Sequence, residues 1–280
     1  MRHLVFCLLA PLLAAAAPPK SLASQTTAKV DVELVIAVDV SGSMSDHEHE
    51  TQRKGFLAAF EDQRLINAIR SGLRGRIAVT YIEWANHHSQ QVLVPWRIVS
   101  DRASAKAFRD ELATKPRSPI RGTSISGALS FAAGLFDGNG IESFRRVIDV
   151  SGDGANRTGP FVEKVRDAVV AKGIIINGLP IMLSPMVNRR THGYGLDHYF
   201  QDCVIGGPSA FVYPVLRDTE LVEAIRRKLI LELSTRPDGK PPLVHVAGEN
   251  TTGAIPVQLP GRRNGQKADC QVGRRYEDDW

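Results

Sequence analysis

The chain has 280 residues, of which 43% are hydrophobic and 23% are charged, values close to the average of globular proteins. They exclude wholesale disorder and a protein with many membrane spans. The 35 basic and 30 acidic residues give a net charge of +5, a mild excess that does not suggest a nucleic-acid binder. Three cysteines are too few for a disulfide scaffold or a four-cysteine zinc site.

The first 23 residues have the layout of a secretory signal peptide. Arg2 and His3 form a short basic start, an apolar stretch covers 4–17, and small residues lead to a predicted cleavage after Ala23. The apolar stretch is shorter than the about 20 residues that cross a bilayer comfortably, although a single N-terminal anchor is the alternative. No later segment has the length and apolarity of a membrane span. We therefore expect a secreted or periplasmic protein.

Cleavage would leave two cysteines, Cys203 and Cys270. In an oxidising compartment a pair is the number expected for one disulfide. Two unpaired buried thiols are the alternative, because the sequence does not show whether the two residues are close.

Apolar runs rich in β-branched residues alternate along the chain with segments of helical spacing. The predicted strands cover 33–38, 76–84, 91–99, 146–150, 174–181 and 210–215. The predicted helices cover 45–70, 102–114, 123–136, 161–172 and 222–233. Pro95 cannot donate to a strand ladder, so its strand is predicted at an edge. The alternation predicts an α/β fold with a largely parallel sheet of about six strands and helices on both faces.

The composition changes after residue 235, where proline and glycine become frequent and the helical period stops. We predict one domain at 24–235 and a loosely ordered Pro/Gly-rich tail at 236–280. One short strand at 243–246 is conceivable, and whether the rest of the tail binds a partner or is disordered stays open.

A group of oxygen-bearing residues follows the first predicted strand, in Asp39-Val40-Ser41-Gly42-Ser43. In open α/β sheets ligands bind at the carboxyl ends of the strands. Asp39, Ser41 and Ser43 are spaced by two, so an extended turn can aim their oxygens to one side. One carboxylate and two hydroxyls suit a hard divalent cation such as Mg²⁺. By itself, the pattern is more typical of a strand-to-helix turn with a serine cap.

Two later positions strengthen the metal interpretation. Thr123 begins a predicted helix, and Asp153 follows a predicted strand in Ser151-Gly152-Asp153. Each has a simpler explanation, since Thr123 could be only a helix cap and Asp153 only a turn residue beside glycine.

With these residues in order, the sequence resembles the von Willebrand factor A (vWA) domain family. The match is to its metal-ion-dependent adhesion site: Asp39-x-Ser41-x-Ser43 is followed by Thr123 and then by Asp153. The resemblance covers about residues 30–235. It implies a Rossmann-like, three-layer fold with a central, mostly parallel six-stranded sheet and one antiparallel edge strand. A narrower resemblance is to secreted bacterial vWA proteins of unknown function.

The resemblance also implies one Mg²⁺ or Mn²⁺, held directly by Ser41, Ser43 and often Thr123, with Asp39 and Asp153 acting directly or through water. One departure concerns the loop that carries Asp153, which is the third loop of the family's site. Many relatives have Ser-Asp-Gly or Thr-Asp-Gly there. Here Gly152 stands between the serine and the aspartate, so direct contact of Asp153 with the ion is less secure than that of Ser41 and Ser43.

These features predict a secreted or periplasmic, metal-dependent protein-binding module rather than an enzyme. An acidic residue of a partner protein would complete the coordination of the ion, as in the family. A metal-dependent phosphohydrolase is the first alternative, because one open Mg²⁺ site can polarise a phosphate. The other is a structural envelope protein in which the metal only stabilises the fold.

Two further patterns are weak. His47 and His49 lie in an acidic run, but residues two apart face different sides of a helix, so a solvated helix start is predicted there. Asn156-Arg157-Thr158 matches a glycosylation acceptor, a match expected to carry no meaning in a bacterial protein.

Overall fold

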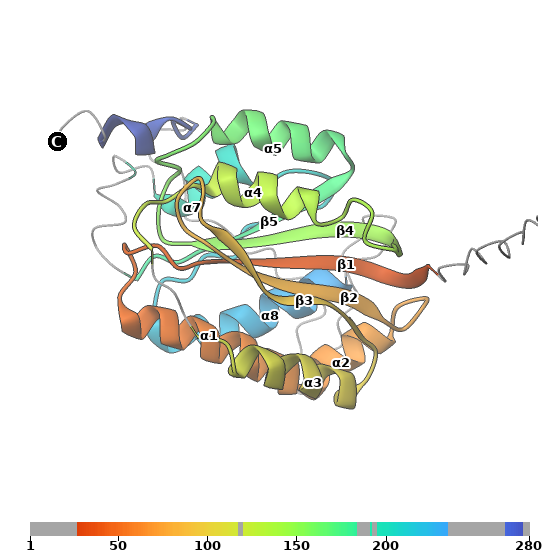
Figure 1. Cartoon of the computed structure of the whole chain (residues 1–280). Coiled ribbons are helices and arrows are strands. Elements are labelled where there is room, and N and C mark those ends of the chain that lie inside the picture. The colour runs from red at the N-terminus through yellow and green to blue at the C-terminus, as the bar shows by residue number, and fades with distance from the viewer. Residues whose placement is uncertain (1–26, 117–119, 184–190, 192–194, 235–266, 277–280) are drawn as a thin grey trace, which may run out of the picture.

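The computed structural model describes residues 27–116, 120–183, 191, 195–234 and 267–276. A five-stranded sheet with strand order β3-β2-β1-β4-β5 crosses the middle of the molecule (Figure 1). The strands are β1 (Ala28–Asp39), β2 (Ile77–Trp84), β3 (Gln90–Val99), β4 (Ile141–Gly152) and β5 (Ile174–Pro180). β1 is parallel to β2 and β4, β4 is parallel to β5, and β3 joins the edge antiparallel. The predicted mostly parallel sheet with one antiparallel edge strand is confirmed.

The sixth predicted strand, at 210–215, is not a continuous strand. It makes isolated parallel bridges to β5 and the residue beyond it, pairing Val212 with Gly178 and Val215 with Ile181. Pro214 lies between the two bridges and has no N–H to donate to a ladder. The segment therefore runs beside β5 as expected, without becoming a member of the sheet.

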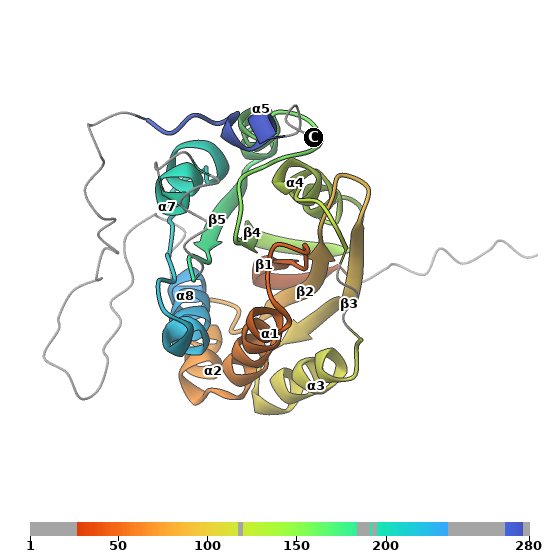
Figure 2. The ribbon, with the colours of Figure 1, turned by 90° about the vertical axis from the view of Figure 1, so that its left-hand side faces the viewer.

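Helices cover both faces of the sheet, as Figure 2 shows along the strands. On one face lie α1 (Asp46–Glu61), α2 (Gln63–Arg70), α3 (Arg102–Ala113) and α8 (Leu221–Ser234). On the other lie α4 (Ile125–Gly134), α5 (Val162–Ala171) and α7 (Leu196–Tyr199), which continues into a short π-helix, η1 (Phe200–Val204). The single helix predicted at 45–70 is two helices, because Asp62 adopts an extended backbone conformation and its side chain caps α2 by accepting from the Arg64 N–H.

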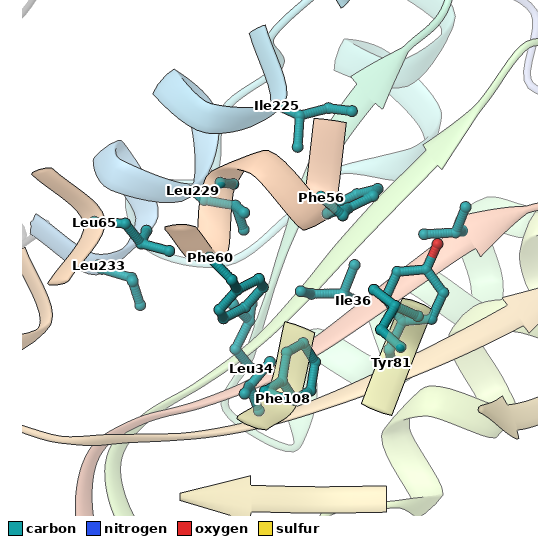
Figure 3. Close-up of a cluster of buried hydrophobic side chains, with 14 of the residues drawn as sticks. Leu34, Ile36, Phe56, Phe60, Leu65, Tyr81, Phe108, Ile225, Leu229 and Leu233 are labelled. Carbon is teal, nitrogen blue, oxygen red and sulfur yellow. The ribbon is translucent and has the colours of Figure 1, made fainter. Parts of the chain in front are cut away.

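The core beneath α1 and α8 is aliphatic with a few aromatic rings, which Figure 3 shows between these helices and the strands. The rings of Phe60 and Phe108 lie 4.5 Å apart. Gly55 allows α1 to approach α8 closely, because a Cβ there would lie 2.5 Å from Ile225 Cδ1. Each fully buried large apolar side chain contributes about 1.5–3 kcal/mol. The packed layers thus form a rigid base for the loops at the strand ends.

The last described segment packs onto the domain. Cys203 in η1 and Cys270 form a disulfide with a Cα–Cα distance of 5.4 Å, so the expected pairing is confirmed. Val272, in a short 3-10 helix η4 (Val272–Tyr276), is 1% exposed in the core beneath α4 and α5. Residues 267–276 thus differ from the expected loose tail, because the disulfide and this apolar contact hold them. The possible strand at 243–246 and the predicted signal peptide lie outside the described residues.

Within the described ranges, no helix has the length and apolarity needed to span a membrane.

Candidate metal centre

The first loop of the candidate site leaves the end of β1 and turns into α1. Asp39 is the last residue of β1 and is fully buried, and its Oδ1 accepts a hydrogen bond of 2.7 Å from the Ser41 N–H. This turn points the chain back over the end of the sheet. Ser45 then caps α1 by accepting from the Glu48 N–H. The loop is fixed at both ends, so its serines have little freedom.

A chain of hydroxyl and carboxyl oxygens joins the first loop to the third. Ser41 Oγ and Ser43 Oγ lie 2.8 Å apart, and Ser43 Oγ donates to Asp153 Oδ1 at 2.5 Å. Asp153 directly follows β4 and is 3% exposed. Because β1 and β4 are adjacent and parallel, their C-terminal ends meet at one edge of the sheet, which faces the viewer in Figure 2. Residues 110 positions apart in the sequence therefore share one polar cluster.

Thr123 reaches the same edge from the second loop. It is 4% exposed and precedes Ser124, which is the residue that caps α4. The Thr123 carbonyl accepts from the Arg157 N–H at 2.9 Å, and its Cγ2 lies 3.8 Å from the place that a Cβ on Gly154 would take. The second loop therefore packs directly on the third, and Thr123 is not itself the cap that the simpler explanation required.

The second loop also contacts the first through its backbone. The Gly42 N–H donates to the Ile120 carbonyl at 3.1 Å, and the Ile120 N–H donates to the Val40 carbonyl at 3.2 Å. All five residues predicted from sequence thus lie in three loops that touch one another: Asp39, Ser41, Ser43, Thr123 and Asp153. That they bind a metal stays a prediction.

The two buried carboxyl groups repel each other. Burial, and then the nearby charge of Asp153, raise the pKa of Asp39 to about 8, although hydrogen bonds from Ser41 and from the Asp153 backbone act in the opposite direction. Among the described residues, Asp39 Oδ2 has no hydrogen-bond partner. An orphaned buried carboxyl oxygen beside a second acid and a pair of hydroxyls suits a hard cation, which prefers oxygen ligands. The residues present therefore fit Mg²⁺ or Mn²⁺.

The cluster is rich in hydroxyls rather than in acids. The described part of the chain holds no group of three or more His, Cys, Asp and Glu side chains that could bind a metal. The candidate centre has two carboxylates, and the remaining donors are the hydroxyls of Ser41, Ser43 and Thr123. Such an all-oxygen set is more typical of Mg²⁺ or Mn²⁺ than of zinc or copper, which favour nitrogen and sulfur ligands.

The departure at Gly152 has a steric cause. A Cβ at this position would lie 2.9 Å from Asp39 Oδ2 and 3.3 Å from the ring of Trp84. Only glycine lets the backbone pass this close to the buried acid. Ser151 takes no part in the cluster, because its Oγ accepts from Gln52 Nε2 of α1 at 2.8 Å.

One residue that supports the site escaped the sequence analysis. Asn156 is 2% exposed, so its side chain is sheltered from the glycosylation that its motif suggests. Its Oδ1 accepts from the Ser126 N–H at 2.9 Å, and its Nδ2 donates to the Pro160 carbonyl at 3.1 Å. The glycosylation pattern did not indicate this role, and the one hint was its position, three residues after Asp153.

The histidine run gives a mixed result. His47 is exposed as expected and lies 3.0 Å from Asp218 Oδ2. His49 differs from the predicted solvated helix start, because it is 4% exposed on the inner side of α1.

The order of the strands and the helices on both faces match the fold of vWA domains, and comparison with solved structures agrees on the fold. Proximal thread matrix protein 1 from the mussel byssus superposes with a TM-score of 0.53 at 10% identity, over 74% of this chain and 48% of that chain. The same protein "with zinc occupied MIDAS motif" gives a TM-score of 0.50 at 12% identity, over the same shares of the two chains. The pilus adhesin SpaC from Lactobacillus rhamnosus GG gives 0.50 at 11% identity, over 73% of this chain and 31% of that one.

At such identities the likeness shows the fold alone, and the chain spans about half or less of the length of these matched chains. A family described as "protein of unknown function (DUF1194)" matches residues 29–237, so the chain belongs to this family. Comparison with curated proteins found no match.

Proposed function

We propose that this protein is a secreted or periplasmic binding module that recognises a partner protein through a divalent metal ion. Ser41, Ser43 and Thr123 would hold Mg²⁺ or Mn²⁺, with Asp39 and Asp153 ligating it or orienting its other ligands. The observation that carries the proposal is the convergence of three loops on a buried acid pair. The pKa of Asp39 in this pair is raised to about 8. In the described part of the chain, Asp39 Oδ2 has no hydrogen-bond partner.

Hydrogen bonding within the cluster prepares the oxygens for a cation. Asp39 Oδ1 accepts from the Ser41 N–H, and Asp153 Oδ1 accepts the Ser43 hydroxyl hydrogen. A serine that donates its proton to a carboxylate keeps its oxygen lone pairs for the ion. These contacts fix the ligand positions before the metal arrives, which lowers the cost of ordering them.

The ligand set leaves room for a partner. Mg²⁺ takes six oxygen ligands in near-octahedral geometry, and five protein oxygens or fewer leave at least one position open. A carboxylate of a partner protein supplies a charged oxygen for that position, while the surrounding loops select its shape. We propose binding rather than catalysis for this arrangement. When bound, the ion would supply a strong positive charge for the incoming carboxylate.

The proposed compartment rests on two features. The predicted signal peptide at 1–23 directs the chain out of the cytoplasm, and the Cys203–Cys270 disulfide suits an oxidising environment. Extracellular and pilus proteins among the structural neighbours support this location.

Titration of the metal-free protein with Mg²⁺ and Mn²⁺ in a calorimeter tests the metal site. We expect one site per chain, and Ser43→Ala should weaken it by about tenfold or more, because it removes a proposed ligand together with the contact to Asp153. Ser130→Ala is the matched control, since Ser130 is exposed on α4. Equal affinities of the wild type and Ser43→Ala would contradict the assignment.

Affinity capture from the native envelope tests the partner. Immobilised wild-type protein with Mg²⁺ should retain proteins that neither wild type in chelator nor Ser43→Ala with Mg²⁺ retains. Identical sets in all three would contradict the binding role and leave only the fold. Adding aspartate-rich peptide at high concentration should release the retained proteins, because its carboxylates compete for the open position.

A further inference from the structure

The C-terminal segment, residues 267–276, is attached to the side of the domain at several points. Figure 2 shows it beside α5, at the end of the sheet where the candidate metal loops lie. The Cys203–Cys270 disulfide fastens it to η1, and the Ala268 N–H donates to Asp202 Oδ2 at 2.8 Å. The guanidinium of Arg274 lies 4.5 Å from the centre of the Phe161 ring, next to the start of α5. The segment is thus an attached element of the domain.

This segment contacts the third loop directly. A Cβ on Gly273 would lie 2.4 Å from the Asn156 carbonyl oxygen and 3.1 Å from Ala155 Cβ, so the two backbones touch at this glycine. One hydroxyl bridges the same two segments, since Tyr199 Oη accepts from the Asn156 N–H at 3.1 Å and donates to the Cys270 carbonyl at 3.4 Å. The loop that begins with Asp153 is therefore supported from outside by the C-terminal segment.

Asn156 also contacts the start of α4, directly after the second loop. Its side chain accepts from the Ser126 N–H in the first turn of α4, directly after the loop that carries Thr123. The N–H groups of Arg157 and Thr158 both donate to the Thr123 carbonyl, at 2.9 and 3.2 Å. Two of the three candidate metal loops are thus connected, through one residue, to the C-terminal segment.

We propose that the C-terminal segment positions the third loop, so that metal affinity depends on its attachment. This inference rests on the proposed function. Residues that orient metal ligands from outside commonly change metal affinity by about 10–100-fold when altered. The segment returns to the domain after a sequence separation of 67 residues from Cys203, so chain entropy opposes its docking and the disulfide offsets that cost. Gly273 and Asn156 are the positioning residues, and the disulfide holds Gly273 in place.

Gly273→Ala tests the contact without touching either the disulfide or the proposed ligands. The added methyl group must push the segment away from Asn156, because the carbonyl oxygen would lie well inside van der Waals distance. Gly134→Ala is the matched control, since a Cβ at that exposed position of α4 meets nothing within 4 Å. We expect Mg²⁺ affinity, measured by calorimetry, to fall about tenfold in Gly273→Ala and to stay unchanged in Gly134→Ala.

Hydrogen exchange supplies a readout that requires no metal. The Arg157 and Thr158 amides should lose protection in metal-free Gly273→Ala, because the loop that aligns them with Thr123 is released. The double variant Cys203→Ser/Cys270→Ser should give the same two changes through a different route, with circular dichroism confirming that the domain remains folded.

The outcomes separate this inference from the metal site itself. If the wild type binds Mg²⁺ and both variants bind it with wild-type affinity, the positioning role is overturned and the metal site stands. If the wild type binds no divalent ion, the proposed metal site fails and this inference falls with it. Loss of affinity in Gly134→Ala to the same degree would also overturn it, because the effect would then not depend on the contact with Asn156.

Discussion

Two groups of buried carboxyl side chains lie in or against the sheet, and they differ in whether a basic side chain of the protein balances their charge. At the C-terminal edge, Asp39 and Asp153 are buried beside serine hydroxyls. Under α8, Asp149 and Glu232 are buried with Lys228, which donates to both and is 0% exposed. The second group carries its own cation within the fold.

The pKa shifts reflect this difference. Burial by itself would lower the pKa of Lys228, but attraction to Asp149 and Glu232 outweighs it and leaves the pKa raised, so the ammonium stays charged. Burial, and then the charge of Asp149, raise the pKa of Glu232 to about 7 even so. The groups that act on Asp39 in the described part of the chain are Asp153 and hydrogen-bond donors, and none of them is a basic side chain.

The comparison separates an acid pair with a structural contact from the acid pair of the candidate metal site. Lys228 of α8 donates to Asp149 of β4. Asn177 of β5 donates to Glu232 Oε1 of α8 at 3.1 Å. The group around Lys228 therefore connects one helix to two strands. Asp39 ends β1 and Asp153 follows β4, so this pair lies at the C-terminal ends of the strands, where ligands bind in open α/β sheets. We infer that a buried acid pair without an internal cation is the better guide to function here.

The largest expected effect is the loss of the internal cation. Lys228→Met should lower the free energy of unfolding by about 3–5 kcal/mol, because removal of one partner from a buried ionic group leaves uncompensated charge. Urea unfolding of the metal-free protein at pH 7 measures it.

The control for Lys228→Met removes the acids as well. Lys228→Met combined with Asp149→Asn and Glu232→Gln should regain much of the lost stability, because no buried charge is left unpaired. A single variant as stable as the wild type would show that the buried ammonium is not what fastens α8.

The next largest effect is a dependence of metal-free stability on pH. The folded-state pKa of Asp39 is raised to about 8 and that of Glu232 to about 7, so the folded protein holds both protons more tightly than the unfolded chain. The resulting stability is full below about pH 4, near the ordinary pKa values of these carboxyl groups, and is lost as the pH rises towards 8. Each of the two groups should contribute up to about 1.4 kcal/mol per pH unit to this slope, since one pKa unit corresponds to about 1.4 kcal/mol.

Magnesium should separate the contribution of Asp39 to this pH dependence from that of Glu232. Saturating Mg²⁺ favours the ionised form of Asp39, so it should remove the share of the slope due to Asp39 and leave the share due to Glu232. Glu232→Gln should do the opposite. Urea unfolding in steps of pH between 5 and 8, with Mg²⁺ or chelator, measures both slopes. Identical slopes with and without Mg²⁺ would contradict the comparison.

Asp153→Asn should have a smaller effect of opposite sign to that of Lys228→Met. It removes one of two repelling charges, so the metal-free protein at pH 8 should become more stable by about 2 kcal/mol. The stabilisation of the wild type by Mg²⁺ should disappear in this variant. Thermal unfolding with and without Mg²⁺ measures both, and a destabilised metal-free variant would show that repulsion between the two acids does not govern stability at the candidate site.

The smallest effect is expected for Ser151→Ala, two residues before Asp153. It breaks the buried hydrogen bond from Gln52, so the protein should lose about 1 kcal/mol of stability. Its Mg²⁺ affinity should stay within about twofold of the wild type, because Ser151 faces α1. A large loss of affinity would place Ser151 among the ligands.

Much of the fold was predictable because its signals are local. Apolar runs of strand length predicted all five strands, and Pro95 correctly indicated the edge. The division between α1 and α2 was missed, because the apolar spacing continues across Asp62 and only the cap interrupts the backbone. α7 and η1 were missed as well, since they are short and their burial comes from packing rather than from a period.

The candidate site was predictable residue by residue, but the reasons for its details were not. The spacing of Asp39, Ser41 and Ser43 is a local pattern, and parallel strands must end at one edge. That Gly152 is required by the approach of Asp39 and Trp84 depends on two other strands, which no local pattern reports. The roles of Asn156 and Gly273 depend on a contact between distant segments.

The linear order of residues determined the alternation of strands and helices, the three oxygen-bearing loops and the pair of cysteines, because each follows from local geometry and chemical type. Tertiary packing alone decided which buried acids meet Lys228 and which do not, that Cys203 meets Cys270, and that residues 267–276 lie against the loop that begins with Asp153. Those outcomes depend on distances between segments far apart in the chain, and electrostatic and steric energies are set by distance in space rather than by separation in sequence.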